Sequence, residues 1–163
     1  MKASEQMALL REFHRDKLAM LERHIAAARY ISHYDFNNTY QYIIAREDVH
    51  VRWLVDAITE MGAEPEDVPE PTVTVQGKAD AAQASLITQD RDGAQAFLDK
   101  WRTRIEGVSN ARHRSMLRVI MGETLEHKRF FEQALAGRTD LLGRRADGAG
   151  TGGGVMSTRW IEQ

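Results

Sequence analysis

Cysteine is absent from this chain of 163 residues. Without thiols the chain forms neither disulfides nor thiolate metal sites, so any metal ligands must be His, Asp or Glu. The chain also lacks an excess of one charge, because 22 Lys and Arg residues nearly balance 24 Asp and Glu residues for a formal net charge of −2. This balance gives no strong attraction to nucleic acid or to an acidic membrane, and we expect neither as a partner.

Long apolar runs are lacking as well. No stretch is long and apolar enough to span a bilayer, and the N-terminal residues lack the apolar core of a signal peptide. We therefore expect a cytoplasmic protein. The composition, with 42% hydrophobic and 28% charged residues, is ordinary for a single globular domain of this length.

Helix breakers are scarce outside two regions. The three prolines are Pro65, Pro69 and Pro71, and seven of the twelve glycines lie between Gly137 and Gly154. The stretches between these regions are rich in helix formers, which predicts long helices there.

Apolar residues recur at helical spacing in four stretches. The first helix is predicted to begin near Ser4 and to place Met7, Leu10, His14, Leu18, Leu21, Ile25 and Ala28 on its apolar side. A turn is expected at residues 33–38, where Asp35, Asn37 and Asn38 offer turn and cap chemistry. The second helix carries Tyr40, Ile43, Ile44, Glu47, His50, Val51, Leu54, Ile58 and Met61 along one side, and Gly62 ends it.

The third helix is predicted to begin with Asp80 as its cap and to run to Val108, with a short turn at residues 107–110. The fourth helix carries Met116, Leu117, Ile120, Glu123, His127, Phe130, Phe131 and Ala134 and stops at Gly137. These elements predict an all-α four-helix bundle over residues 1–137, built from two antiparallel hairpins joined by one long crossover at about residues 62–79. Residues 138–163 form a glycine-rich C-terminal tail with a short apolar end.

Each predicted helix places a carboxylate on its apolar side. Glu47 and His50 are three residues apart, and Glu123 and His127 are four apart, so each pair shares a helix face. Helical spacing also puts two more carboxylates among apolar residues, Glu22 and Asp90. A buried carboxylate costs several kcal/mol unless it is paired, protonated or bound to metal, so this pattern requires a compensating positive charge. A pair of metal ions held by carboxylates and imidazoles supplies one.

The segment from Ala45 to Leu54, with its Glu47-x-x-His50 pair and the closing Gly62, resembles the second helix of ferritin-like di-iron carboxylate proteins of the rubrerythrin and bacterioferritin group. The segment from Gly122 to His127 resembles the second such motif, although Thr124 stands where that motif has glutamate. The resemblance covers roughly residues 4–137. It implies a protein that binds two iron ions, or manganese, and that handles iron or reacts with oxygen or peroxide. The metal ligands it implies are Glu22, Glu47, His50, Asp90, Glu123 and His127.

A second hypothesis is a metal-free bundle of the same kind that serves as an interaction or dimerisation module. In that case arginines neutralise the carboxylates: Glu22 pairs with Arg23 or Arg29, and Asp90 with Arg91 or a neighbouring arginine. The remaining histidines, His14, His24, His33 and His113, are then ordinary satisfied or exposed residues. Under both hypotheses we expect a homo-oligomer. The tail, in which residues 148–154 are a linker and residues 155–161 an apolar peptide, suggests a docking peptide for a protein partner.

Overall fold

The computed structural model describes residues 1–143. Four long helices account for most of them: α1 (Ala3–Ala28), α2 (Tyr34–Glu60), α3 (Asp80–Trp101) and α4 (Ala111–Leu135), with a short 3₁₀ helix η1 (Arg104–Gly107) before α4. This part of the chain contains no strand, which confirms the prediction of an all-α protein. The linker and apolar peptide predicted at residues 148–161 lie outside the described residues.

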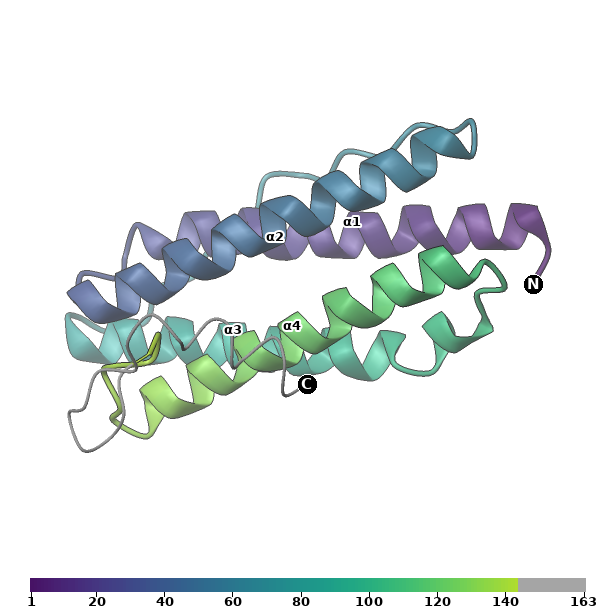
Figure 1. The fold of residues 1–163 in the computed structure, drawn as a ribbon. Helices are drawn as coiled ribbons and strands as arrows, with labels where there is room; N and C mark the ends of the chain where they lie inside the picture. Colours follow the sequence, from purple (N-terminus) through teal and green to yellow (C-terminus); the bar gives the residue numbers. More distant parts are fainter. Residues whose placement is uncertain (144–163) are drawn as a thin grey trace.

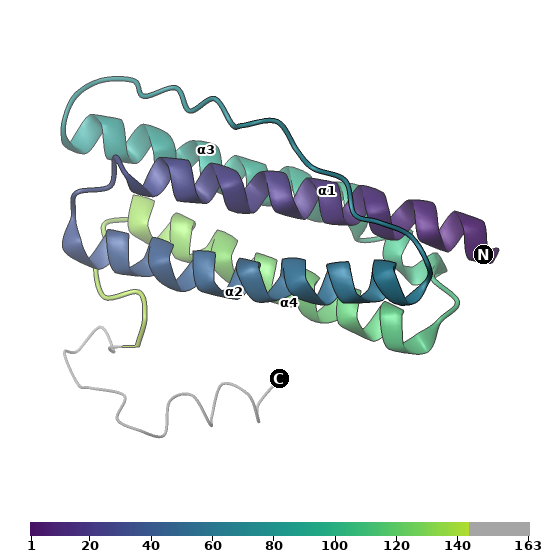
Figure 2. The same cartoon turned by 90° about the horizontal axis from the view of Figure 1, so that it is seen from above.

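The helices form two hairpins. Figure 1 shows α1 and α2 side by side in opposite directions, with α3 and α4 in the same relation below them. Residues 61–79 connect the hairpins, and Figure 2 shows this segment returning along the length of the molecule, so that α2 and α3 run in the same direction. None of the helices within residues 1–143 is long and apolar enough to cross a membrane.

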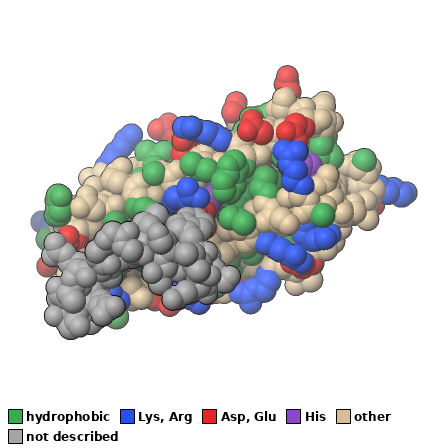
Figure 3. All heavy atoms as spheres, viewed as in Figure 1, with side chains coloured by type: hydrophobic (Ala, Val, Ile, Leu, Met, Phe, Trp, Pro, Cys, Tyr) green, Lys and Arg blue, Asp and Glu red, His purple; other side chains and the backbone are tan. Residues whose placement is uncertain are grey.

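The interior has apolar ends and a polar middle. One apolar cluster includes Leu10, Phe13, Leu54, Trp101, Leu117 and Ile120, and the other includes Ala28, Ile31, Ile43, Leu86, Phe130 and Phe131. Between these clusters lie buried charged and polar side chains, among them Lys17, Glu47, Asp90 and Thr124. On the face shown in Figure 3, acidic and basic side chains are interspersed, and apolar side chains gather between α2 and α4.

The first turn is shorter than predicted. Helix α2 begins at Tyr34, with the His33 side chain accepting a hydrogen bond from the Phe36 amide, so residues 34–38 are helical instead of forming the turn. The Asn37 side chain donates hydrogen bonds to the Ala28 and Ile31 carbonyl oxygens at 3.1 and 3.0 Å. Asn37 therefore caps the C-terminal end of α1, although it lies inside α2.

The third helix is also shorter than predicted. It begins at Asp80, but the cap position is occupied by Ala79 and not by Asp80, and no side chain caps the helix. It ends at Trp101, and η1 then carries the chain to Val108. Trp101, Ile105 and Val108 are all buried, so the apolar spacing of the sequence continues beyond the end of α3. This spacing therefore does not indicate where the helix breaks. The ends predicted at Gly62 and Gly137 are confirmed, because both glycines have positive φ just after the last helical turn. The buried Leu141 extends the packed region beyond residue 137.

Candidate functional site

The buried face of α1 differs from the apolar stripe expected from the sequence. Lys17 and His24 point into the core, whereas Leu18 is half-buried and Ile25 is 36% exposed. Counting only apolar residues shifts the predicted stripe around the helix, because Lys17 and His24 are then assigned to the solvent side. Together with His14, which is 2% exposed and lies on the side where it was expected, helix α1 thus contributes three basic side chains to the interior.

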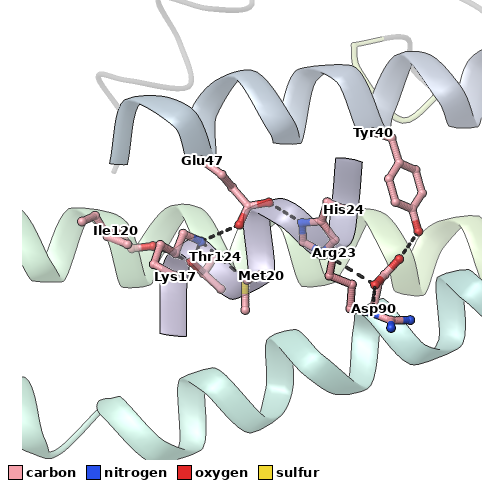
Figure 4. Close-up of polar contacts among 9 residues, drawn as sticks. All are labelled: Lys17, Met20, Arg23, His24, Tyr40, Glu47, Asp90, Ile120 and Thr124. Carbon is pink, nitrogen blue, oxygen red and sulfur yellow. Dashed lines mark hydrogen bonds and ion pairs between the residues drawn. The ribbon is translucent and has the colours of Figure 1, made fainter. Parts of the chain in front are cut away.

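Lys17 is completely buried and pairs with Glu47, which is also completely buried. Lys17 Nζ forms an ion pair with Glu47 Oε2 at 2.9 Å, but the angles of this contact do not meet the criteria for a hydrogen bond. Lys17 Nζ donates a hydrogen bond to Thr124 Oγ1 at 3.1 Å. Figure 4 shows this ammonium group between α1, α2 and α4. Its remaining surroundings include the Phe97 ring, whose centroid is 5.3 Å away. The positive charge is therefore held at the centre of the bundle.

The second oxygen of Glu47 accepts a hydrogen bond from His24 Nδ1. On the other side of the imidazole, Nε2 lies 3.8 Å from Asp90 Oδ1. Asp90 is buried and accepts hydrogen bonds from Arg23 Nε at 2.9 Å and from the Tyr40 hydroxyl. These contacts link three helices through a group that we call the α1 network: Lys17, Arg23, His24, Tyr40, Glu47 and Asp90 (Figure 4).

Electrostatics in the α1 network favour charged forms. Burial by itself raises the pKa of Glu47, but His24 and Lys17 more than offset it, and the pKa lies well below its usual range. Burial likewise lowers the pKa of His24, but the charge and hydrogen bond of Glu47 prevail, and the net direction is upward. Burial, together with Asp90, raises the pKa of Tyr40, which keeps its hydroxyl protonated as a donor.

A second group lies between α2 and α4, and we call it the α4 network: Arg46, His50, Glu123 and His127. Glu123 accepts hydrogen bonds from His50 Nε2 and from Arg46 Nη2, the latter at 2.8 Å. The His127 ring is stacked near that of His50, with centroids 6.4 Å apart, and is 1% exposed. Both His127 nitrogens and His50 Nδ1 lack hydrogen-bond partners within the described residues.

The α4 network favours neutral imidazoles. Burial lowers the pKa of His127 to about 3, and burial also lowers the pKa of His50. Burial raises the pKa of Glu123, but His50 and Arg46 reverse this, and the pKa is lowered. A buried polar atom without a partner costs roughly 1–3 kcal/mol, so the unpartnered nitrogens need a physical explanation.

The six candidate ligands fall into different environments. Glu47, His50, Glu123 and His127 face the polar middle of the bundle, where the sequence placed them. Asp90 also lies there, but its partners are Arg23 and Tyr40. Arg91 pairs instead with Asp92. Glu22 is only half-buried and does not take part in either network. Within residues 1–143, no three His, Asp or Glu side chains converge in a way that could hold a metal ion.

Sequence reasoning missed the cations of the site. Lys17, Arg23 and Arg46 each contact one of the candidate ligands, and His24 bridges two of them. The available signal was spacing: Lys17 and His24 are seven residues apart, which places them on one face of α1 together with Leu10, Leu21 and Ala28. Lysine is almost never fully buried unless it is paired, so spacing alone does not identify Lys17 as a core residue.

The residues present do not fit a pair of metal ions. In the position where a metal would neutralise Glu47, the structure has the Lys17 ammonium, and a second cation there would face direct repulsion. Comparison of the chain with protein-family models, with curated proteins and with solved structures found no match.

Proposed function

We propose that this protein is a ferritin-like four-helix bundle that works without a metal pair, as a binding module. Two features support the ferritin-like topology: antiparallel hairpins and a long crossover that makes α2 and α3 parallel. Because the same bundle architecture hosts many functions, the proposal depends on the site and not on the fold.

One observation carries the proposal: the completely buried Lys17 pairs with Glu47 of the Glu47-x-x-His50 motif. A metal site needs its carboxylates free to bind the ion, but here each candidate carboxylate of the two networks already has a protein cation. Glu47 has Lys17 and His24, Asp90 has Arg23, and Glu123 has Arg46. The second hypothesis from the sequence expected arginines in this role. The structure adds a lysine and a histidine to them.

Such networks have a physical use in a binding module. A buried ion pair contributes little net stability compared with an apolar pair, but it requires one particular alignment of its helices. The α1 network joins α1, α2 and α3, so it holds the two hairpins in a fixed relation. Surfaces that span both hairpins are then presented rigidly to a partner or ligand.

Metal analysis tests the proposal. Protein purified from cells supplemented with iron and manganese is measured for metal content, together with a Glu47→Ala/His50→Ala double variant. We expect both proteins to contain far less than one ion per chain. About two ions per chain in the wild type, lost in the double variant, would contradict the proposal and support the di-iron or di-manganese oxidase or ferroxidase-like function implied by the resemblance.

One observation favours a second candidate function, a protein that binds a single metal ion. The buried His127 has two unpartnered ring nitrogens, and His50 has one. An ion bound by these two imidazoles would supply redox or Lewis-acid chemistry between α2 and α4. One ion per chain in the same analysis, lost in a His127→Phe variant, would establish this candidate instead.

A further inference from the structure

A cleft of about 360 Å³ lies between α1 and α3, beside the α1 network. Its apolar lining consists mainly of small or flexible side chains: Ala19, Met20, Gly93, Ala94, Ala96 and Phe97. Alanine and glycine leave space that larger residues would fill, which is why the two helices enclose an opening at this level. The charged residues that line it include Arg23, His24 and Asp90.

The imidazole of His24 brings a nitrogen without a hydrogen bond to this cleft. The side chain is 3% exposed, and its Nδ1 is engaged by Glu47. Its Nε2 lies 3.8 Å from Asp90 Oδ1, within ion-pair range but too far for a hydrogen bond, and it makes no hydrogen bond within residues 1–143. Because carboxylates flank the ring on both sides, Nε2 favours carrying a proton and is available as a donor.

Arg23 supplies a second free donor. Its Nε donates to Asp90 and its Nη2 donates to Gln89 at 2.7 Å, whereas Nη1 has no partner in the described part of the chain. The side chain is 27% exposed, so the guanidinium lies where the cleft meets solvent. Lys100, the other cation of the lining, is already paired with Glu12 and Asp16. The two oxygens of Asp90 accept hydrogen bonds from Arg23 and Tyr40, and Asp16, which also lines the cleft, accepts from Lys100 and Trp101 through Oδ2. Arg23 Nη1 and His24 Nε2 remain as donors without a hydrogen bond in the described residues.

We propose that the α1–α3 cleft binds a small monocarboxylate with an apolar body. Its carboxylate would accept hydrogen bonds from Arg23 and His24, and its body would lie along Ala94, Phe97 and the open side of Gly93. A neutral hydrocarbon would leave both donors unmet. A phosphate ester would bring a second negative charge close to Asp16 and Asp90. The proposal rests on the binding role proposed above and specifies its ligand.

Binding of octanoate to the full chain tests the proposal, with 1-octanol as the uncharged probe, both followed by calorimetry and amide NMR shifts. We expect saturable binding of octanoate, with shifts confined to α1 and α3, and at least tenfold weaker binding of 1-octanol. Equal affinities would overturn the carboxylate head group, because a tenfold ratio, or about 1.4 kcal/mol, is a modest demand on a charged contact. Absence of octanoate binding would overturn the site.

A matched pair of variants locates the ligand. Gly93→Leu and Gly122→Leu both replace an exposed glycine inside a helix where an added Cβ meets no atom within 4 Å. Each change should raise helix stability, by up to about 1 kcal/mol, so both proteins should fold. Gly93 lines the cleft and Gly122 does not. We expect Gly93→Leu to weaken octanoate binding at least tenfold and Gly122→Leu to leave it unchanged. Equal effects would overturn the location.

Metal content of the same preparations keeps the two proposals separate. Octanoate binding to a metal-containing protein would contradict the metal-free function while supporting the cleft. A metal-free protein that binds no octanoate would retain the first proposal and overturn the second.

Discussion

The two polar networks lie in the same layer of one bundle, but one buries charged side chains in ion pairs and the other buries neutral imidazoles. In the α1 network, charges are kept and matched: Lys17 and His24 surround Glu47, while Arg23 and Tyr40 hold Asp90. In the α4 network, the imidazoles avoid charge, and His127 has no hydrogen-bond partner in the described residues. The difference arises from α1, which brings cations to one side of Glu47 only.

Whether a pair of residues with ligand spacing can bind metal depends on the side chains that face it from the neighbouring helices. Glu47 and His50 have the spacing of a metal-binding pair, but a lysine on the neighbouring helix converts the carboxylate into half of an ion pair. The imidazoles on the far side keep unpartnered nitrogens because no equivalent partner reaches them. Substitutions that remove one partner of a contact should therefore lower the free energy of unfolding by different amounts, depending on whether the contact involves buried charges.

The largest effect is expected for Glu47→Gln, which leaves both Lys17 and His24 without their counter-charge. Removing one partner of a buried pair typically costs about 3–5 kcal/mol, and we expect a loss in this range in the free energy of unfolding, measured with urea. A Lys17→Met/Glu47→Gln double variant should lose less than the sum of the two single variants, because its core contains fewer unpaired charges.

The control for this prediction is Asp48→Asn, which breaks an exposed pair with Arg52 on the same helix. Such a surface pair contributes about 0–1 kcal/mol. Equal losses for Glu47→Gln and Asp48→Asn would show that the buried ion pair is not important for stability.

A smaller effect is expected at Tyr40. The Tyr40→Phe variant retains the buried ring and removes the hydroxyl that donates to Asp90. Hydrogen bonds to charged groups contribute about 1.5–3 kcal/mol, so a loss of about 2 kcal/mol in unfolding free energy is expected. Tyr42→Phe is the matched control, because no hydroxyl partner of Tyr42 occurs within residues 1–143, and it should change stability by at most about 0.5 kcal/mol. A loss at Tyr42 as large as at Tyr40 would count against the α1 network.

The two networks should respond to pH in opposite directions. The folded pKa of His127 is lowered to about 3, so an unfolded chain with an ordinary histidine pKa of about 6.5 binds more protons between these values. Stability is then lost as pH falls below about 6.5, by at most about 1.4 kcal/mol per pH unit and per histidine. His24 has a raised pKa, so its contribution is complete below about 6.5 and is lost as pH rises through its folded pKa.

Urea unfolding at a series of pH values separates these contributions. We expect His127→Phe to flatten the decline between about pH 6.5 and 4.5, above the range in which carboxylates titrate, and His24→Gln to flatten the decline on the alkaline side. If the unfolding free energy depended on pH in the same way in the wild type and in both variants, neither imidazole would be buried as described.

The sequence predicted most of the fold because helix formers, glycine stops and clustered prolines are local signals. Gly62 and Gly137 follow their helices as predicted. The errors occurred where a longer-range contact decides the outcome. Asn37 carries turn chemistry, but it uses that chemistry on the carbonyl oxygens of the previous helix, and this allows α2 to begin earlier.

The site was predicted less completely for a related reason. Carboxylates at apolar positions indicated buried charge, and five of the six candidates do face the polar layer or its cleft. Which cations neutralise them depends on how α1 is rotated against α2 and α3, and the apolar pattern of α1 gave the wrong rotation at Leu18 and Ile25. Lys17 became identifiable as a core residue only when its carboxylate partner was placed opposite it.

The most direct test of the account is the free energy of unfolding measured once with a chelator and once with excess Mn²⁺. A metal that binds only the folded state at a hundred times its dissociation constant adds about 2.7 kcal/mol. If Lys17 is the counter-charge of Glu47, the two free energies should agree. A metal-dependent gain of that size, abolished by Glu47→Ala/His50→Ala, would contradict the account and show that a metal ion can displace the lysine.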